Sequence, residues 1–232
     1  MSEITRVLAR AQLPAERASE GEQAARDATT PLSLAAQGSL LVAACYRWDE
    51  QLFLYYECVR GELAPDQVLP EMSAYLEDWP GQDRKRKWVP MIDVFHFNAP
   101  ASLDHWRRKT PVERRVGRVA RLLPDMAASY IYYHYQLQEE RAFLGPKYEI
   151  IAMHENVLFG YQEFPAVVEE PALAKKLTTS GTPANWNDSR MDLHFQPWPD
   201  GHLYFKPAQE LFAYMSKEYE RRQDADRNDF AN

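Results

Sequence analysis

The chain has 232 residues, of which 45% are hydrophobic and 12% aromatic, enough to bury the core of one large or two small domains. Its formal net charge of −7 at pH 7 disfavours a main role in binding nucleic-acid backbones. No run of residues approaches the roughly 18–20 apolar residues of a membrane helix, and the N-terminus lacks the apolar segment of a signal peptide, so a cytoplasmic protein is expected.

The first 38 residues are predicted to form an N-terminal arm. Residues 11–30 are rich in Ala, Glu, Arg and Gln and lack strong apolar periodicity, which indicates loose order or a short surface helix. The arm is followed by a predicted α+β unit over residues 39–110.

This first unit opens with two apolar runs, 40–48 and 51–59, separated by Asp49 and Glu50, a pattern typical of a β-hairpin. Apolar residues at three- and four-residue spacing then predict a helix over 65–81, and a strand is predicted over 88–97. The two cysteines, Cys45 and Cys58, fall in the hairpin and are predicted to be buried free thiols.

A second α+β unit is predicted over residues 111–215. Its first element is a helix over 111–123, followed by a central strand over 128–138, because this run holds four tyrosines of high β propensity. A second hairpin joins 148–153 to 157–164 across residues 154–156. The remaining predicted elements are a short helix at 172–177, a strand at 191–196, closing segments at 203–206 and 208–215, and a C-terminal tail over 216–232.

Two basic clusters interrupt this pattern. One is the run Arg84-Lys85-Arg86-Lys87, and the other is the set Arg114, Arg115, Arg118 and Arg121 on one side of the predicted helix. Because the chain is acidic overall, both clusters are interpreted as solvated faces rather than as nucleic-acid contacts.

An internal repeat links the two units. Residues 52–57 and 158–163 share the pattern L-F-x-Y-x-E, each on the second strand of a predicted hairpin. Each copy precedes a tryptophan and a segment with Asp and His, residues 93–97 and 192–195. We therefore expect a duplicated fold in which Tyr and Glu of each copy share one face of a strand.

Several kinds of site are disfavoured by the absence of their motifs. The six histidines show no H-E-x-x-H pattern or tight ligand spacing, and no Gly-rich phosphate loop or G-x-S-x-G elbow occurs. We therefore expect no metal ion, no nucleotide cofactor and no other bound cofactor.

Acid/base chemistry by histidine, tyrosine and carboxylate remains, since histidine titrates near neutrality. For any single histidine the structural role is favoured, in which its ring is buried and bonded to a backbone carbonyl. The candidate catalytic residues are His96, His134, His194, Glu57 and Glu163. The candidate substrate-binding residues are Tyr55, Tyr161, Trp79, Trp186 and Tyr130.

Three motifs give the chain a resemblance to the L-rhamnose mutarotase-like members of the dimeric α+β barrel (ferredoxin-like) family. These are L-F-G-Y-Q-E at 158–163, Thr182-Pro183 with Trp186 and Met191, and D-V-F-H-F at 93–97. The resemblance covers roughly residues 40–98 and 149–215 and implies tandem α+β-barrel units with antiparallel sheets and covering helices. The family places a catalytic tyrosine and histidine four residues apart on a helix. Tyr130 and His134 have this spacing, in a segment predicted here to be a strand.

The leading functional hypothesis is a metal-independent acid/base enzyme, mutarotase- or isomerase-like, that acts on a sugar or another small polar metabolite. One alternative is a non-catalytic ligand-binding or assembly module of the same fold, with its aromatic strands buried. A homo-oligomer is compatible with either hypothesis. A second alternative is a haem-dependent barrel protein with a histidine as axial ligand.

Overall fold

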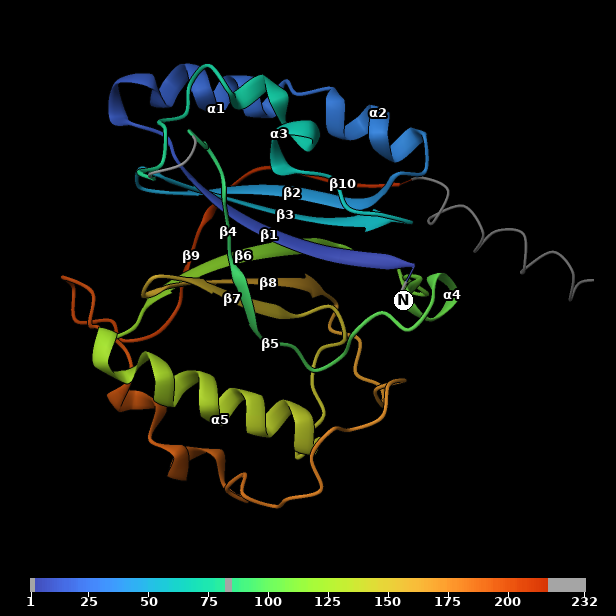
Figure 1. The fold of residues 1–232 in the computed structure, drawn as a ribbon, viewed down its shortest axis with the longest axis vertical. Helices are drawn as coiled ribbons and strands as arrows, with labels where there is room; N and C mark the ends of the chain where they lie inside the picture. Colours follow the sequence, from blue (N-terminus) through green and yellow to red (C-terminus); the bar gives the residue numbers. More distant parts are fainter. Residues whose placement is uncertain (1–2, 82–84, 217–232) are drawn as a thin grey trace, which may run out of the picture. The chain divides into compact units, whose positions relative to one another are not determined.

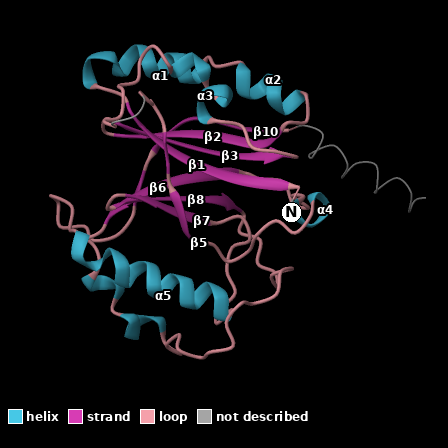
Figure 2. Cartoon of the chain, viewed as in Figure 1, coloured by secondary structure: helices cyan, strands magenta, loops and turns pink. Residues whose placement is uncertain are grey.

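The computed structural model describes residues 3–81 and 85–216, and the chain divides into two compact units. Unit 1 comprises Met1–Pro90, Pro100–Val112 and Gln209–Asn232, and unit 2 comprises Met91–Ala99 and Glu113–Ala208. Each unit is built on an antiparallel five-stranded sheet with covering helices, which confirms the predicted α+β class (Figures 1 and 2). The division does not follow the predicted boundaries at residues 38 and 110, because each unit takes segments from distant parts of the chain.

Unit 1 has a sheet in the order β10-β2-β3-β1-β4. Helices α1 and α2 and the short α3 lie over one face of this sheet (Figure 1). The strands are β1 (Ile4–Gln12), β2 (Leu40–Trp48), β3 (Gln51–Val59), β4 (Val89–Pro90) and β10 (Gln209–Met215). The helices are α1 (Ala18–Arg26), α2 (Thr30–Ala36), α3 (Pro65–Val68) and α4 (Leu103–Trp106), with 3-10 turns η1 (Ala15–Arg17) and η2 (Pro70–Met72).

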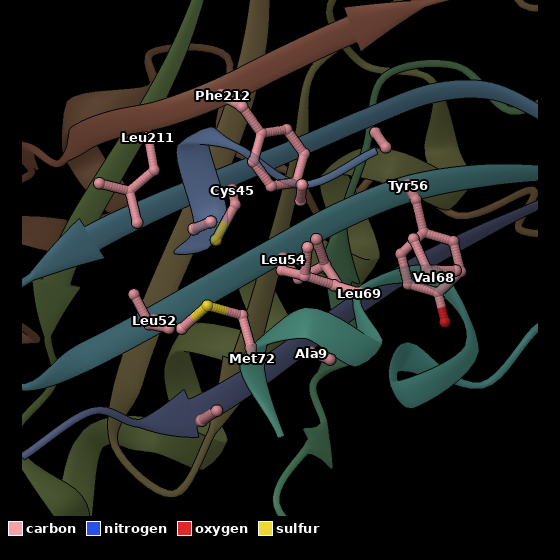
Figure 3. Packing of buried hydrophobic residues seen from close by; sticks show 14 of the residues in the cluster. Ala9, Cys45, Leu52, Leu54, Tyr56, Val68, Leu69, Met72, Leu211 and Phe212 are labelled. Carbon is pink, nitrogen blue, oxygen red and sulfur yellow. The ribbon is translucent and has the colours of Figure 1, made fainter. Parts of the chain in front are cut away.

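The core of unit 1 lies between this sheet and its helices. Alternate residues of β3 enter it, and Met72 of η2 and Phe212 of β10 pack with them (Figure 3). The predicted hairpin is confirmed: β2 and β3 pair across the two residues Asp49 and Glu50, and Asp49 takes the positive φ of 55° that such a tight turn requires.

Both cysteines are free and buried in this core, as predicted. Burial raises the pKa of the Cys45 thiol to about 12, and it also raises the pKa of Cys58. Because the thiolate is the reactive form, we expect iodoacetamide at pH 8 to alkylate Cys45 at least about 100-fold more slowly in the folded protein than in urea. Mass spectrometry of the alkylated peptide measures this rate, and equal rates in both conditions would contradict the burial.

Unit 2 has a sheet in the order β5-β7-β8-β6-β9, with helix α5 lying along one face (Figure 1). Its strands are β5 (Ile92–Phe95), β6 (Arg114–Arg121), β7 (Ile150–His154), β8 (Val157–Phe164) and β9 (Lys206–Pro207). Its helical elements are α5 (Ala127–Glu140) and the 3-10 turns η3 (Pro124–Met126), η4 (Trp186–Ser189) and η5 (Met191–Leu193). The second predicted hairpin is confirmed as β7 and β8.

The two sheets have the same topology. In each unit the fourth strand, β4 or β9, pairs with the first, and the second and third strands form a hairpin, which is the strand order of a ferredoxin-like unit. The L-F-x-Y-x-E copies occupy matching positions, since Arg6 pairs with Glu57 and Arg115 pairs with Glu163. Duplication stays a prediction, and this correspondence supports it.

One part of the predicted repeat is wrong. Residues 191–193 form the turn η5 rather than a strand, so they do not match residues 93–97. The segment that matches 89–97 is 206–214: each begins at an edge strand with a proline, and each has a bulge at the same place, between Asp93 and Phe95 and between Glu210 and Phe212. Residues 192–195 were matched to 93–97 only because both segments contain Asp and His. The backbone pairing shows that this match was accidental.

The N-terminal region is more ordered than predicted. Residues 4–12 form β1, which pairs along its whole length with β3, and residues 18–26 and 30–36 form helices. The alternative of a short surface helix within 11–30 is thus nearer to the structure than loose order. The predicted helix over 65–81 is reduced to α3 and η2, because Pro70 interrupts the backbone hydrogen bonds.

In unit 2, one predicted helix is a strand and one predicted strand is a helix. Residues 111–123 were expected to be helical but contain β6, and 128–138 were expected to be a strand but lie in α5. The buried residues Tyr130, His134 and Leu137 have helical spacing, and Tyr132 and Tyr135 face solvent. The high β propensity of tyrosine concealed this stripe, and tertiary packing overrode the propensity.

Smaller elements also differ. Residues 172–177 were predicted to be helical but have no regular structure, whereas the closing segments are close to β9 and β10. Residues 217–232 of the predicted tail and Arg84 of the basic run lie outside the described residues. In the described part of the chain, no helix combines the length and the apolar character needed to cross a bilayer.

Candidate functional site

The candidate site centres on His134, in the middle of α5 in unit 2. The helix faces the sheet with a stripe of buried side chains, and His134 is the histidine of this stripe, in contact with aromatic residues of the core. Its side chain is 8% exposed. Burying an imidazole costs free energy, so such a histidine is expected to be hydrogen-bonded or to have a function.

Its hydrogen bonding fixes one tautomer. Nδ1 lies 2.9 Å from the backbone carbonyl oxygen of Tyr130, so Nδ1–H donates and Nε2 carries the lone pair. Burial lowers the pKa of His134 to about 4, against the opposing effect of the bond to Tyr130, and His194 lowers it further. His134 is therefore neutral at physiological pH, and its Nε2 makes no hydrogen bond to any residue in the described part of the chain.

Aromatic rings surround this imidazole. The ring of Tyr130 stacks on it at 3.9 Å between centroids, and the rings of Phe95 and Trp186 meet it edge-on at 5.2 and 5.4 Å. The pKa of the Tyr130 hydroxyl is raised above its ordinary value by burial, so it stays a protonated donor. A hydrogen-bond acceptor and a phenolic donor thus stand on two stacked rings within an apolar shell.

His194 lies against the same helix, but both of its ring nitrogens are hydrogen-bonded. Its Nδ1 donates to the carbonyl oxygen of Arg190 at 3.0 Å, and its Nε2 accepts from the Ser129 hydroxyl at 2.7 Å. The side chain is 2% exposed. With both nitrogens satisfied, His194 fits the structural role of tying residues 190–195 to the start of α5, and it is not placed to transfer a proton.

The predicted carboxylate of unit 2 lies elsewhere. Glu163 accepts a hydrogen bond from Tyr161 at 2.8 Å, and Arg115 lies 3.9 Å from it. Strand alternation places Tyr161 and Glu163 on the face of the sheet opposite to Leu158, which packs in the α5-side core. Glu163 therefore lies on the opposite face of the sheet from the α5-side core and does not join His134 or His194.

The corresponding carboxylate of unit 1 forms a buried ion pair. Arg108 binds Glu57 through two nitrogens, at 2.7 and 2.8 Å, and Tyr55 and the Trp106 indole donate to Glu57 at 2.6 and 3.0 Å. Burial alone would raise the pKa of Glu57, but Arg108, with Arg6 and the Tyr55 hydroxyl, lowers it. Every contact here satisfies the carboxylate, so this network stabilises unit 1 and leaves no basic oxygen free for catalysis.

The other predicted residues do not join the His134 site. His96 is hydrogen-bonded through Nδ1 to Asp93 at 2.8 Å, on β5. Trp79 lies in unit 1, where its backbone pairs with Arg86 and the Arg10 guanidinium lies 5.0 Å from its ring centroid. The structure thus brings together four of the ten predicted residues: His134, Tyr130, Trp186 and His194.

Two members of the site escaped the sequence interpretation. Phe95 lies in the D-V-F-H-F motif but was not named as a site residue, and Ser129 belongs to no motif. The i, i+4 spacing of Tyr130 and His134 was the signal that could have identified the helix and hence Ser129 on its first turn. Among the described residues, no group of three or more His, Cys, Asp or Glu side chains could hold a metal ion.

Comparison with known proteins gives distant structural likenesses. No protein-family model and no curated protein matches this chain. A solved structure from Lactobacillus acidophilus, described as a "putative monooxygenase", is 11% identical with a TM-score of 0.39, and the match covers 91% of this chain and 97% of the other. One of the same description from Fusobacterium nucleatum is 7% identical (TM-score 0.39, covering 92% and 95%), and an anthrone oxidase-like protein is 9% identical (TM-score 0.35, covering 94% and 95%). Likenesses this distant assign no activity to the chain, and its family is left open by them.

Proposed function

We propose that unit 2 binds an uncharged small molecule at His134 and that this residue acts as a general base there. The observation that carries the proposal is the unoccupied Nε2 lone pair of a neutral histidine, buried to nine-tenths among aromatic rings. Because this lone pair has no partner within the described residues, a ligand that donates a hydrogen bond can complete it. Unit 1 offers no counterpart, because its only histidine, His105, lies on α4 rather than on a helix packed against the sheet.

The surroundings restrict the chemistry of the ligand. Nε2 requires a donor, such as a hydroxyl or an N–H group, and the shell of Tyr130, Phe95 and Trp186 favours an apolar or aromatic body. A sugar needs polar partners around its whole rim, which this shell lacks. We therefore infer a ligand with a mainly apolar skeleton and one hydroxyl near its reactive position, rather than a carbohydrate.

The pKa of His134 also restricts the reaction. An imidazolium with a pKa of about 4 holds a proton only when an anion forms beside it and stabilises its charge. Proton transfer is then favoured for an acidic hydroxyl or for a C–H group whose anion stays in place, with the Tyr130 hydroxyl as the donor that supports it. Such a reaction needs no group beyond these side chains and the substrate.

Histidine NMR tests the proposal. The 15N-labelled full-length protein is titrated with a library of uncharged phenols, alcohols and ketones, and exchange of ligand C–H protons with deuterated water is followed in the same samples. We expect a hit to shift the Nε2 signal of His134 and to exchange faster than in buffer. Hits that bind while His134 stays unperturbed would overturn the proposal.

Haem binding is the second candidate, because an Nε2 lone pair on a ring anchored through Nδ1–H is also the arrangement of an axial ligand. Three aromatic rings pack against the His134 ring at 3.9 to 5.4 Å between centroids, which favours the first candidate over a macrocycle. A Soret band that disappears in His134→Phe would reverse this order.

A further inference from the structure

A long segment after β8 takes the place of a second covering helix in unit 2. Between the first hairpin and the edge strand β4, unit 1 has α3 and η2, whereas the same interval of unit 2 holds only the 3-10 turns η4 and η5. We define residues 176–195 as the strap. It contacts α5 in reverse order, first Glu139 and Glu140, then His134, and finally Ser129, so it runs antiparallel to the helix.

The first end of the strap is held by charge-assisted hydrogen bonds. The carboxylate of Glu140 accepts from the Thr179 and Thr182 hydroxyls, both at 2.5 Å, and from the backbone N–H groups of Gly181 and Thr182, both at 2.8 Å. The side-chain amide of Gln136 also lies against Gly181, where a Cβ would come within 1.9 Å of its Nε2. This end is therefore a tight attachment.

The second end is held as firmly. His194 bonds to Ser129 through Nε2, and its carbonyl oxygen accepts from the backbone N–H of Leu123 at 2.9 Å. Phe195, the next residue, forms a β-bridge with Leu122 and is buried in the core of unit 2.

The middle of the strap has no such attachment. Within the described part of the chain, residues 183–189 make hydrogen bonds only among themselves and to Arg190, for example from the Ser189 hydroxyl to the Trp186 carbonyl. Arg190 has a φ of 51°, so the backbone reverses there. Trp186 packs against the core, where its indole lies edge-on to His134, and Ser189 of the same turn is also buried, at 2% exposed.

We propose that residues 183–189 are a gate, which covers His134 with the Trp186 indole and admits ligand by moving outward between Thr182 and Arg190, the two residues at which the strap is held. The self-contained hydrogen bonding of the turn lets it move as one body without exposing unpaired backbone groups. Breaking only apolar contacts keeps the cost of opening small. The inference deepens the proposed function, because it rests on a ligand reaching His134.

Chemical modification tests the gate without knowledge of the ligand. Diethyl pyrocarbonate attacks neutral imidazole, and peptide mass spectrometry resolves the rate at each histidine of the full-length protein. The exposed His202 serves as the internal reference. We expect His134 to react slowly in the wild type and about tenfold or more faster in Trp186→Ala, with Trp186→Phe in between.

Two controls separate gating from unfolding. Leu193 lies on the strap but is 50% exposed, so Leu193→Ala should leave the His134 rate unchanged. Opening of the gate exposes little surface, so the rate should be nearly constant at low urea concentrations, whereas global unfolding would accelerate it steeply. A His134 rate that equals the His202 rate in the wild type, or that Trp186→Ala does not change, would overturn the gate. A gate that behaves as expected in a protein whose His134 never responds to ligands would instead overturn the proposed function alone.

Discussion

Replacing Arg108 by methionine is expected to lower the free energy of unfolding by about 3–5 kcal/mol, because it leaves the Glu57 carboxylate buried without its cation. Glu57 is fully buried and Arg108 is 5% exposed, so water cannot replace the lost partner. The two remaining donors, Tyr55 and Trp106, satisfy hydrogen bonds but do not neutralise the charge. Urea denaturation followed by circular dichroism measures the change.

Lys109 provides the matched control, since it is the adjacent cationic residue and is exposed. Lys109→Met is expected to change stability by no more than about 0.5 kcal/mol. Acid should reproduce part of the Arg108 effect in the wild type: the pKa of Glu57 is lowered in the folded state, so its stabilising contribution is present above the unfolded pKa near 4.5 and is lost as the pH falls below it. Equal stability of the two variants would show that Arg108 is not the partner on which Glu57 depends.

Replacing His134 by glutamine is expected to lower the turnover of a ligand identified by NMR by about 10²–10⁴-fold while changing its affinity far less. The glutamine carbonyl can still accept the ligand hydroxyl but cannot take up a proton. His134→Phe should lose both turnover and binding. Steady-state kinetics with isothermal titration separates the two variants, and His202→Gln, at an exposed position, should behave as wild type.

The pH dependence gives a second signature of His134. With a folded pKa of about 4, the rate should stay constant through the neutral range and fall only as the pH approaches that value. Stability follows the same group: because the folded pKa lies below the unfolded value of 6.5, the unfolded chain takes up the proton first, and stability decreases as the pH falls from about 6.5 to about 4. A rate that already falls through the neutral range would show that His134 is not the base.

The hairpins were the most predictable part of the fold. The turns at Asp49-Glu50 and Glu155-Asn156 separate apolar runs of strand length, and both runs and turns are local properties of the sequence. The elements between the hairpins were not predictable in the same way. Tyrosine-rich residues 128–138 and arginine-rich residues 114–121 have local preferences that the packing of α5 on the sheet and the pairing of β6 with β8 override.

The candidate site shows the same division. Sequence reasoning named His134, Tyr130, Trp186 and His194 because their residue types suit acid/base and aromatic contacts, and it named Glu163 for the same reason. It could not show that Glu163 lies on the opposite face of the sheet, since that depends on the register of β8 against its neighbours.

By itself, then, the sequence determined the α+β class, the two hairpins, the paired L-F-x-Y-x-E strands and the list of residues able to carry the chemistry. Tertiary structure alone decided which histidine has a free nitrogen, since His134 and His194 differ only in the partners that the strap and α5 bring to them. The physical reason is the distance along the chain over which each effect acts. Hydrophobic periodicity and turn chemistry depend on residues a few positions apart. Burial, hydrogen bonding and the resulting pKa depend on groups that are far apart in the sequence, such as Ser129 and His194.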